Sequence, residues 1–183
     1  MKKGKIIFLN GVSSSGKTTI SKSLQERLTE PYYWIAGDTF VSMLPEKYLA
    51  NADIEQIETT FILYYQTIKT FSDMGINVIA DHVFNKSVTP YRKCLALLNG
   101  HPVLFVHVTC PLEELRRREK ERADRPDGCA ENLLSVLWPQ DTYDITIDTH
   151  NETLDECVDR IIAALKQPDN YSAFKTLWLQ HSE

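Results

Sequence analysis

A glycine- and serine-rich loop near the start of the chain constrains its possible folds more than any other feature. Residues 11–18 read GVSSSGKT and match the pattern G-x-x-x-x-G-K-[ST] at every fixed position. In this pattern the glycines let backbone N–H groups turn toward phosphate oxygens, the lysine reaches the β- and γ-phosphates, and the next hydroxyl is offered to Mg²⁺. We therefore expect ATP and Mg²⁺ as cofactors. The predicted nucleotide-binding residues of this segment are Gly11, Val12, Ser13, Ser14, Ser15, Gly16, Lys17, Thr18 and Thr19.

The segments on both sides of the loop support this interpretation. Residues 5–10 form a short apolar run, and Ile20, Leu24 and Leu28 follow the loop at steps of four. These patterns predict a buried strand before the loop and a helix with one apolar stripe after it. A flexible Gly/Ser linker is the alternative, but a linker would not separate two core elements near the start of a domain.

Apolar strand patterns alternate with helical patterns along the rest of the chain. Strands are predicted at residues 5–10, 32–36, 76–80, 103–108 and 143–147, and the longest helix at residues 53–74. Thr153 and Glu156 are predicted to cap the last core helix. This alternation predicts an α/β fold, a single-domain P-loop NTPase with a central parallel sheet of about five strands, helices on both faces and a helical lid. The kinase domain is expected at residues 1–167, with the lid at about 118–131. Residues 168–183 are predicted to form a C-terminal helical tail, docked on the body or on another subunit as in a homo-oligomer.

Composition excludes several classes of protein. The chain has 183 residues and a formal net charge of −5, which argues against a partner as acidic as nucleic acid. No apolar run is long enough to span a membrane, and the run after the basic first residues is too short for a secretion signal. The four cysteines form no CxxC pair, so neither a zinc site nor a disulfide scaffold is indicated. A cytoplasmic location is the simplest expectation.

Two aspartates follow predicted strands and are candidates for chemistry. Asp38 comes after residues 32–36 and Asp81 after residues 76–80. Because ligands bind at the carboxyl ends of parallel strands, both should lie on the same rim as the phosphate loop. Asp38 is the candidate base that accepts the proton of the acceptor hydroxyl, and Asp81 with Thr18 is the candidate metal site. Asp38, Asp81 and His82 are the predicted substrate-binding residues.

Each of these three assignments has a structural alternative. Asp38 could be the N-cap of a helix that begins at Thr39, and Asp81 could bond only to loop backbone. His82 could be a structural residue whose hydrogen bonds are satisfied within the fold.

An arginine-rich segment, residues 116–125 with the sequence RRREKERADR, suits a lid. Arg118, Arg122 and Arg125 are spaced by four and three, so they share one face of a helix, and Pro126 and Gly128 then break it. Arginines on a closing lid can stabilise charge on the transferring phosphoryl group, and Arg118 is a further predicted nucleotide-binding residue. The alternative is a solvated helix with Glu–Arg pairs, which is strongest for the first two arginines of the segment.

With these motifs identified, the chain resembles the chloramphenicol phosphotransferase family from about Lys5 to Leu165. The resemblance is carried by IIFLNGVSSSGKTTI, WIAGDTFVSMLP, VIADHVF, and VTCPLEELRRREKERADR followed later by YDITIDT. The first stretch is general to P-loop kinases, and the second is the more diagnostic one. In the family its aspartate is the base proposed for the drug's hydroxyl, and it corresponds to Asp38.

The resemblance implies a nucleotide-kinase-like fold and phosphorylation of a small hydroxylated acceptor with ATP and Mg²⁺, as in a chloramphenicol 3-O-phosphotransferase. It also implies catalytic roles for Asp38, Lys17, Arg122 and Arg125. This sequence departs from the family pattern in the third stretch, where His82 replaces the second of two adjacent aspartates. Residues 46–57 show little match, and the tail after Pro168 is extra.

Two other functions remain open at this stage. A nucleotide or metabolite kinase of the adenylate or shikimate kinase type would have the same fold, but such enzymes often hold an anionic acceptor with arginines. Between Thr39 and Met74 the chain offers only Lys47 and Lys69 and no arginine, which favours an uncharged or weakly charged acceptor. An ATP-binding regulatory module without kinase activity would need a partner surface, for which residues 171–178 are the only indication.

Overall fold

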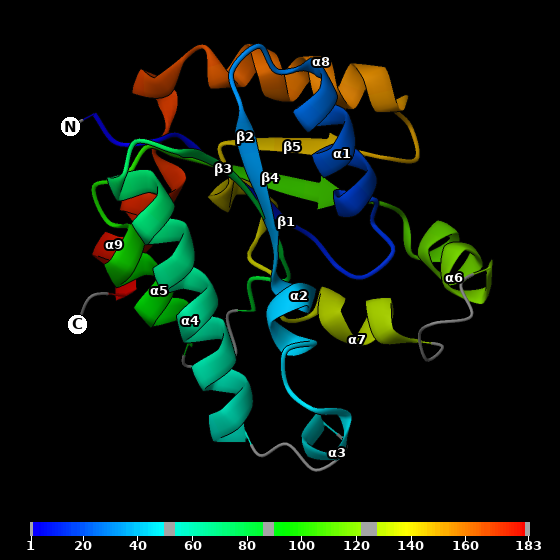
Figure 1. Cartoon of the computed structure of the whole chain (residues 1–183). Helices are drawn as coiled ribbons and strands as arrows, with labels where there is room; N and C mark the ends of the chain where they lie inside the picture. Colours follow the sequence, from blue (N-terminus) through cyan, green and yellow to red (C-terminus); the bar gives the residue numbers. More distant parts are fainter. Residues whose placement is uncertain (1, 50–53, 86–89, 122–127, 182–183) are drawn as a thin grey trace.

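The computed structural model describes residues 2–49, 54–85, 90–121 and 128–181, and these form a parallel sheet covered by helices on both faces (Figure 1). The strands are β1 (Ile6–Asn10), β2 (Tyr32–Ala36), β3 (Asn77–His82), β4 (Val103–Thr109) and β5 (Ile145–Asp148). Their order in the sheet is β2-β3-β1-β4-β5, and every pairing is parallel. The prediction of a parallel sheet of about five strands is therefore confirmed.

The helices divide between the two faces of the sheet and its carboxyl end. Helices α1 and α8 cover one face, whereas α4, α5 and α9 cover the other (Figure 1). Helices α2, α3, α6 and α7 lie toward the carboxyl ends of the strands. The helices are α1 (Lys17–Arg27), α2 (Gly37–Val41), α3 (Glu46–Leu49), α4 (Ile54–Asp73), α5 (Pro90–Leu98), α6 (Leu112–Glu121), α7 (Cys129–Leu134), α8 (Leu154–Leu165) and α9 (Ala173–His181), with 3-10 turns η1 (Gln140–Thr142) and η2 (Pro168–Asn170).

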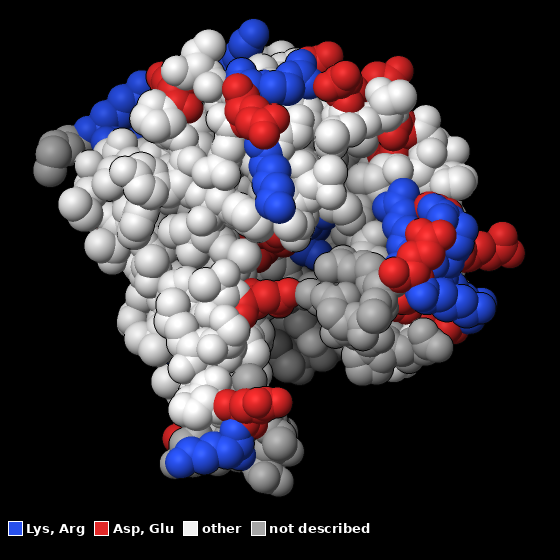
Figure 2. Space-filling model, turned by 45° about the vertical axis from the view of Figure 1, so that its right-hand side comes forward, with Lys and Arg blue, Asp and Glu red and all other residues white. Residues whose placement is uncertain are grey.

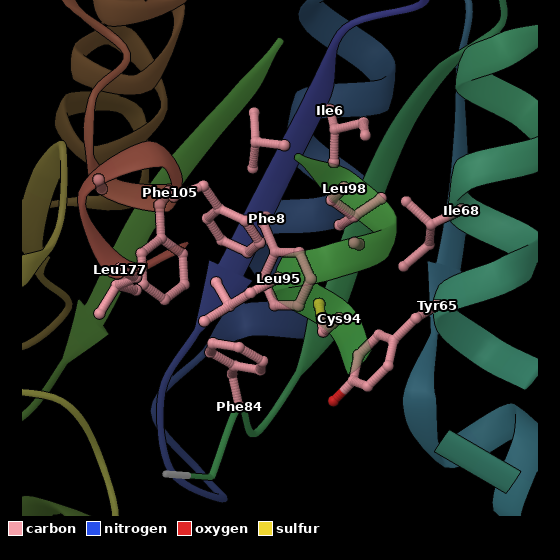
Figure 3. Close-up of a cluster of buried hydrophobic side chains, with 14 of the residues drawn as sticks. Ile6, Phe8, Tyr65, Ile68, Phe84, Cys94, Leu95, Leu98, Phe105 and Leu177 are labelled. Atoms are coloured by element: carbon pink, nitrogen blue, oxygen red, sulfur yellow. The ribbon is translucent and has the colours of Figure 1, made fainter. Parts of the chain in front are cut away.

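Strand β1 is buried along its whole length and contributes side chains to the hydrophobic core on each face of the sheet. Its side chains alternate, so Phe8 packs toward α4, α5 and α9 while Leu9 packs toward α1 and α8. The Phe8 ring lies 5.6 Å from that of Phe84 and 5.8 Å from that of Phe105, and these rings meet Leu177 of α9 in one cluster (Figure 3). The C-terminal helix therefore docks on the body of its own chain.

Several element boundaries differ from the sequence prediction. Strand β3 extends to His82, so Asp81 and His82 end the strand instead of following it. Strand β5 begins only at Ile145, because Tyr143 turns inward and its ring packs 4.4 Å from that of Phe105. Asp38 lies inside the first turn of α2, whose N-cap is Ala36, so the N-cap alternative for Asp38 was wrong.

Other local features agree with prediction. Thr153 and Glu156 form a reciprocal capping box at the start of α8. The predicted helix–break–helix segment appears as α6, which ends at Glu121, and α7, which begins at Cys129. Arg122 and Arg125 lie outside the described residues. Within the described ranges, no helix combines the length and apolar character needed to cross a bilayer.

The strand order creates a crevice at the carboxyl end of β1. The chain runs from β1 to β2 and β3 on one side, then crosses to β4 on the other side of β1. Such a reversal leaves an open crevice between the connections, and ligands of parallel sheets bind there. Residues 11–16 leave β1 directly into this position.

Candidate active site

A cleft of about 650 Å³ opens at the carboxyl ends of the strands. In Figure 2 it is the hollow near the middle of the molecule, with acidic side chains and recessed basic atoms beside it. We call the part lined by residues 13, 14 and 16–19, Arg118 and Thr149 the loop half, and the part lined by Asp38, Thr39, His82 and Val83 the α2 half. Asp81 lines the cleft as well. The predicted site residues that line this cleft are Ser13, Ser14, Gly16, Lys17, Thr18, Thr19, Asp38, Asp81, His82 and Arg118.

The loop itself has the backbone of an anion cradle. Gly16 has a φ of +96° and Ser14 a φ of +62°, so two residues adopt the left-handed conformation. A serine rarely does so, and such a backbone is maintained where the surrounding structure requires it. A side chain at Gly11 would put its Cβ 2.3 Å from the carbonyl oxygen of Val108, which leaves room only for glycine. Gly11, Val12 and Ser15 are buried beneath the cleft surface.

The carbonyl groups of the loop are satisfied from both sides. Lys17 Nζ donates to the carbonyl oxygens of Gly11 and Val12, each at 2.9 Å. The carbonyl of Ser15 accepts from Thr149 Oγ1 at 2.9 Å, and that of Ser14 accepts from Arg118 Nη1 at 3.4 Å. The buried hydroxyls of Ser14 and Ser15 have no hydrogen-bond partner among the described residues. Unpartnered donors within a turned, glycine-containing loop fit the oxygens of a phosphate group.

A hydroxyl and a carboxylate meet beside the loop. Thr18 Oγ1 donates to Asp81 Oδ2 at 3.2 Å, and Lys17 Nζ lies 4.0 Å from Asp81 Oδ1. Burial raises the pKa of Asp81, while the charge of Lys17 and the bond from Thr18 oppose that rise. No group of three or more His, Cys, Asp or Glu side chains suited to a metal occurs among the described residues. Oxygen donors in small number fit Mg²⁺, which keeps several waters and takes its other ligands from substrate phosphates.

The α2 half presents a carboxylate and a histidine ring that packs against aromatic residues of α4. Asp38 is exposed in the first turn of α2. His82 is buried, and its ring centroid lies 4.4 Å from that of Phe61 and 5.3 Å from that of Tyr64. Burial lowers the pKa of His82 to about 3, and the charge of Lys17 adds to this effect. His82 is therefore a neutral imidazole at physiological pH.

Gly37 explains how α2 approaches β3 so closely. A Cβ on this residue would lie 2.6 Å from His82 Nδ1, so only glycine fits between the helix and the histidine. The close approach brings Asp38 and His82 to the same half of the cleft.

The arginine-rich segment divides into surface and interior residues. Arg116 pairs with Glu131 and Arg117 with Glu114, in exposed ion pairs of the kind that the solvated-helix alternative predicted. Glu119 does not belong to that pattern, because it is only 2% exposed and accepts from the backbone N–H groups of Gly128 and Ala130. This carboxylate joins the start of α7 to α6 across the segment that contains Arg122 and Arg125.

Sequence analysis missed two side chains that support the cleft. Asn10 ends β1; its Nδ2 donates to Tyr143 Oη at 2.9 Å and its Oδ1 accepts from the N–H of Phe84 at 2.7 Å. Thr149 follows β5 and contacts both the loop and Arg118. Both residues stand at carboxyl ends of predicted parallel strands, which was the signal that could have identified them.

Comparison with known proteins connects this geometry to a family. Residues 4–166 match the family described as chloramphenicol phosphotransferase-like protein. An adenylyl-sulfate kinase of Clostridium acetobutylicum is 27% identical over 90% of this chain and 84% of its own length. A Mycobacterium tuberculosis protein described provisionally as an O-phosphotransferase is 30% identical over 81% of this chain and 76% of its own length.

The fold is shared with solved kinase structures. The Mycobacterium tuberculosis APS kinase, in complex with AMPPNP and APS, superposes with a TM-score of 0.68 at 16% identity, covering 91% of this chain and 99% of the kinase chain. The predicted P-loop kinase fold is thereby confirmed.

Proposed function

The chain belongs to the chloramphenicol phosphotransferase-like family, and we propose that it transfers the γ-phosphoryl group of ATP to a hydroxyl of an uncharged small molecule. Membership of a phosphotransferase family makes it an enzyme, and its curated relatives identify the broad class as P-loop small-molecule kinases. Our proposal concerns the nucleotide, the catalytic residues and the kind of acceptor.

The loop half suits the triphosphate of ATP. Backbone N–H groups of the loop and the unpartnered Ser14 hydroxyl would surround the phosphates. Lys17 would exchange the carbonyl oxygens of Gly11 and Val12 for phosphate oxygens. Thr18 and Asp81 would hold Mg²⁺, which when bound neutralises charge on the phosphates. Arg122 and Arg125 stay candidates for the same task from the lid.

The α2 half suits the acceptor. Asp38 would orient the acceptor hydroxyl and take its proton as the oxygen attacks the γ-phosphorus. A new P–O bond forms to the acceptor, the bond to the β-phosphate oxygen breaks, and ADP leaves. The observation that carries this proposal is that Asp38 shares one cleft with the phosphate loop and with the Thr18–Asp81 pair.

The charge of the cleft favours an uncharged acceptor. Among the described lining residues the cationic ones are Lys17 and Arg118, and both already bond to the loop. The carboxylates among them are Asp38, Asp81, Glu121 and Glu152. An anionic acceptor would meet these carboxylates without a dedicated cation from the described part of the chain, whereas a neutral alcohol such as chloramphenicol would not be repelled. His82 would contribute a neutral nitrogen and an aromatic surface to this half.

A cytoplasmic location also belongs to the proposal. Cys94, Cys110 and Cys157 are buried free thiols, which suits a reducing compartment where ATP is abundant.

The test is an acceptor panel with the purified chain, ATP and Mg²⁺. ADP release would be measured together with the mass of each acceptor, using chloramphenicol and other neutral alcohols, with shikimate and adenylyl sulfate as anionic comparators. We expect one neutral alcohol to gain the mass of one phosphoryl group while the anionic comparators do not. Preferential phosphorylation of an anionic comparator would instead identify a metabolite kinase of the adenylate or shikimate kinase type and overturn the acceptor class proposed here.

A further inference from the structure

Two side chains from outside the phosphate loop bond to its carbonyl groups. Thr149 Oγ1 donates to the carbonyl of Ser15 at 2.9 Å. Arg118 Nη1 donates to the carbonyl of Ser14 at 3.4 Å and to Thr149 Oγ1 at 2.9 Å, while Arg118 Nη2 donates to the carbonyl of Thr149 at 3.0 Å. We call this set of contacts the outer clasp. It joins α6, the end of β5 and the loop.

The outer clasp matters because of how such a loop binds phosphate. Backbone N–H groups point into the cradle only if the carbonyl groups of the same peptides point away from it. A carbonyl that turns away into a partly buried position needs a donor, and leaving it without one is costly. The outer clasp supplies donors to the carbonyl groups of Ser14 and Ser15, the two residues that precede the left-handed Gly16.

The bonding capacity of Thr149 is already used within the protein. A hydroxyl carries one proton, and the closer of its two carbonyl acceptors is that of Ser15 at 2.9 Å, compared with 3.4 Å for that of Thr109; the Cys110 thiol also lies within hydrogen-bonding reach of Thr149. Its methyl group faces Gly16, where a Cβ would lie 3.3 Å away. Thr149 therefore contacts the loop through both branches of its side chain.

Arg118 is held in a similar way. Its Nε donates to Glu114 Oε1 at 2.8 Å, so each nitrogen of the guanidinium group has a protein partner. Within the described residues this arginine is oriented by the fold and its edge is directed at the loop and Thr149. That arrangement differs from an arginine whose edge is directed at phosphate oxygens.

We propose that Thr149 is a positioning residue for the phosphate loop, held in place by Arg118, and that its hydroxyl sets the affinity for nucleotide by fixing the Ser15 peptide. The inference rests on the nucleotide-binding part of the proposed function and is independent of the acceptor. It reassigns Arg118, predicted from the sequence to contact the cofactor, to a role exerted through the loop.

Thr149→Val and Thr149→Ser form a matched pair for the test. Valine keeps the branched shape against Gly16 and removes the hydroxyl, whereas serine keeps the hydroxyl and removes the methyl group. Binding of AMPPNP with Mg²⁺ to the full chain would be measured by calorimetry, without any acceptor. We expect Thr149→Val to raise the Kd about tenfold, since the Ser15 carbonyl loses its donor, and Thr149→Ser to stay within about threefold of the wild type.

Arg118→Lys supplies a second variant, because lysine keeps the charge but lacks the planar fork that reaches Ser14 and Thr149 together. We expect the Kd of Arg118→Lys to rise by a comparable factor. In the double variant of Thr149→Val and Arg118→Lys, the Kd should rise by less than the product of the two single-variant factors. The Tm of each variant without nucleotide verifies that it is folded.

Three results would overturn the inference. They are wild-type affinity in Thr149→Val, equal losses in the valine and serine variants, or fully independent effects of Thr149 and Arg118. Failure of the wild-type chain to bind AMPPNP would be a different result, because it would contradict the nucleotide site itself.

Discussion

The loop half of the cleft is built around the backbone of one short segment, whereas the α2 half is built from side chains of α2 and of the end of β3. In the loop half, Lys17, Arg118 and Thr149 bond to loop carbonyl groups, and the unpartnered hydroxyl of Ser14 belongs to a residue of the cleft lining. In the α2 half, an exposed Asp38 faces a buried neutral His82. Under the proposed function this difference would separate the two substrates, because backbone can recognise the phosphates common to many kinases while side chains would select one acceptor.

If the two halves have these separate tasks, variants should separate acceptor chemistry from nucleotide binding. The largest effect is expected for Asp38→Asn, which keeps the shape and removes the base. Phosphoryl transfer should fall about 10²–10⁴-fold, the usual contribution of general base catalysis, while the Kd for AMPPNP with Mg²⁺ changes less than about twofold. Steady-state kinetics with the acceptor identified by the panel and calorimetry measure the two quantities.

Asp169→Asn is the matched control, because Asp169 is an exposed aspartate of η2 outside the cleft lining. Its kinetics should equal those of the wild type. Parallel losses of transfer and nucleotide affinity in Asp38→Asn would instead make Asp38 a structural or metal-binding residue, and the division between the halves would not hold.

Lys17→Met should affect both quantities, since Lys17 belongs to the loop half. The side chain reaches two loop carbonyls and lies 4.0 Å from Asp81, so its removal disturbs the cradle and the metal pair together. We expect transfer to fall about 10²–10³-fold, as when a transition-state donor is lost, with weaker nucleotide binding. Lys22→Met, at an exposed position of the same helix, is the control. Unchanged nucleotide affinity in Lys17→Met would contradict the role assigned to Lys17.

The loop half was predictable from sequence because its chemistry is local. One contiguous motif between an apolar strand and an apolar-striped helix specified residues 11–18, and strand alternation specified the parallel sheet. Asp38 and Asp81 could be assigned to the same rim because parallel strands align their carboxyl ends. This reasoning needs only the order of elements along the chain.

The rest depends on packing between distant segments. Asn10 bonds to Tyr143 and Phe84, and Glu119 to the N–H groups of Gly128 and Ala130, contacts that follow no spacing in the sequence. The burial of His82 likewise required the position of α4, whose aromatic residues surround its ring. Propensity and periodicity predict helices and strands, but the packing of these elements against one another determines which polar side chains become buried.

A smaller effect is expected for His82→Phe, which tests whether the α2 half selects the acceptor. Phenylalanine keeps an aromatic ring against Phe61 and Tyr64 but removes both ring nitrogens. We expect kcat/KM for the acceptor to fall about five- to tenfold, the cost of one neutral hydrogen bond, with nucleotide affinity unchanged. Kinetics across the neutral alcohol panel measure this. If the variant had the same kcat/KM as the wild type for every alcohol of the panel, His82 would be a structural residue, as its alternative interpretation held.

The smallest effect is expected in the pH dependence of the free energy of unfolding, which tests whether His82 is buried in the folded protein. Because burial lowers the pKa of His82 to about 3, the unfolded chain binds more protons than the folded chain between that value and the ordinary value of 6.5. The free energy of unfolding should therefore be greatest above pH 6.5 and decrease as the pH falls toward 3. At pH 5 the contribution of this one group is at most about 2 kcal/mol.

Urea unfolding of the wild type and of His82→Phe, at pH 5 and pH 7.5 with a metal chelator present, isolates that contribution. Burial also lowers the pKa of His107 and raises the pKa of Asp81, but both groups are present in both proteins, so their pH dependence largely cancels in the comparison. We expect the wild type to lose more stability on acidification than the variant. Equal losses would mean that His82 accepts a proton in the folded protein. The α2 half would then present a titratable side chain to the acceptor instead of a neutral one. The contrast between the α2 half and the loop half would be weaker.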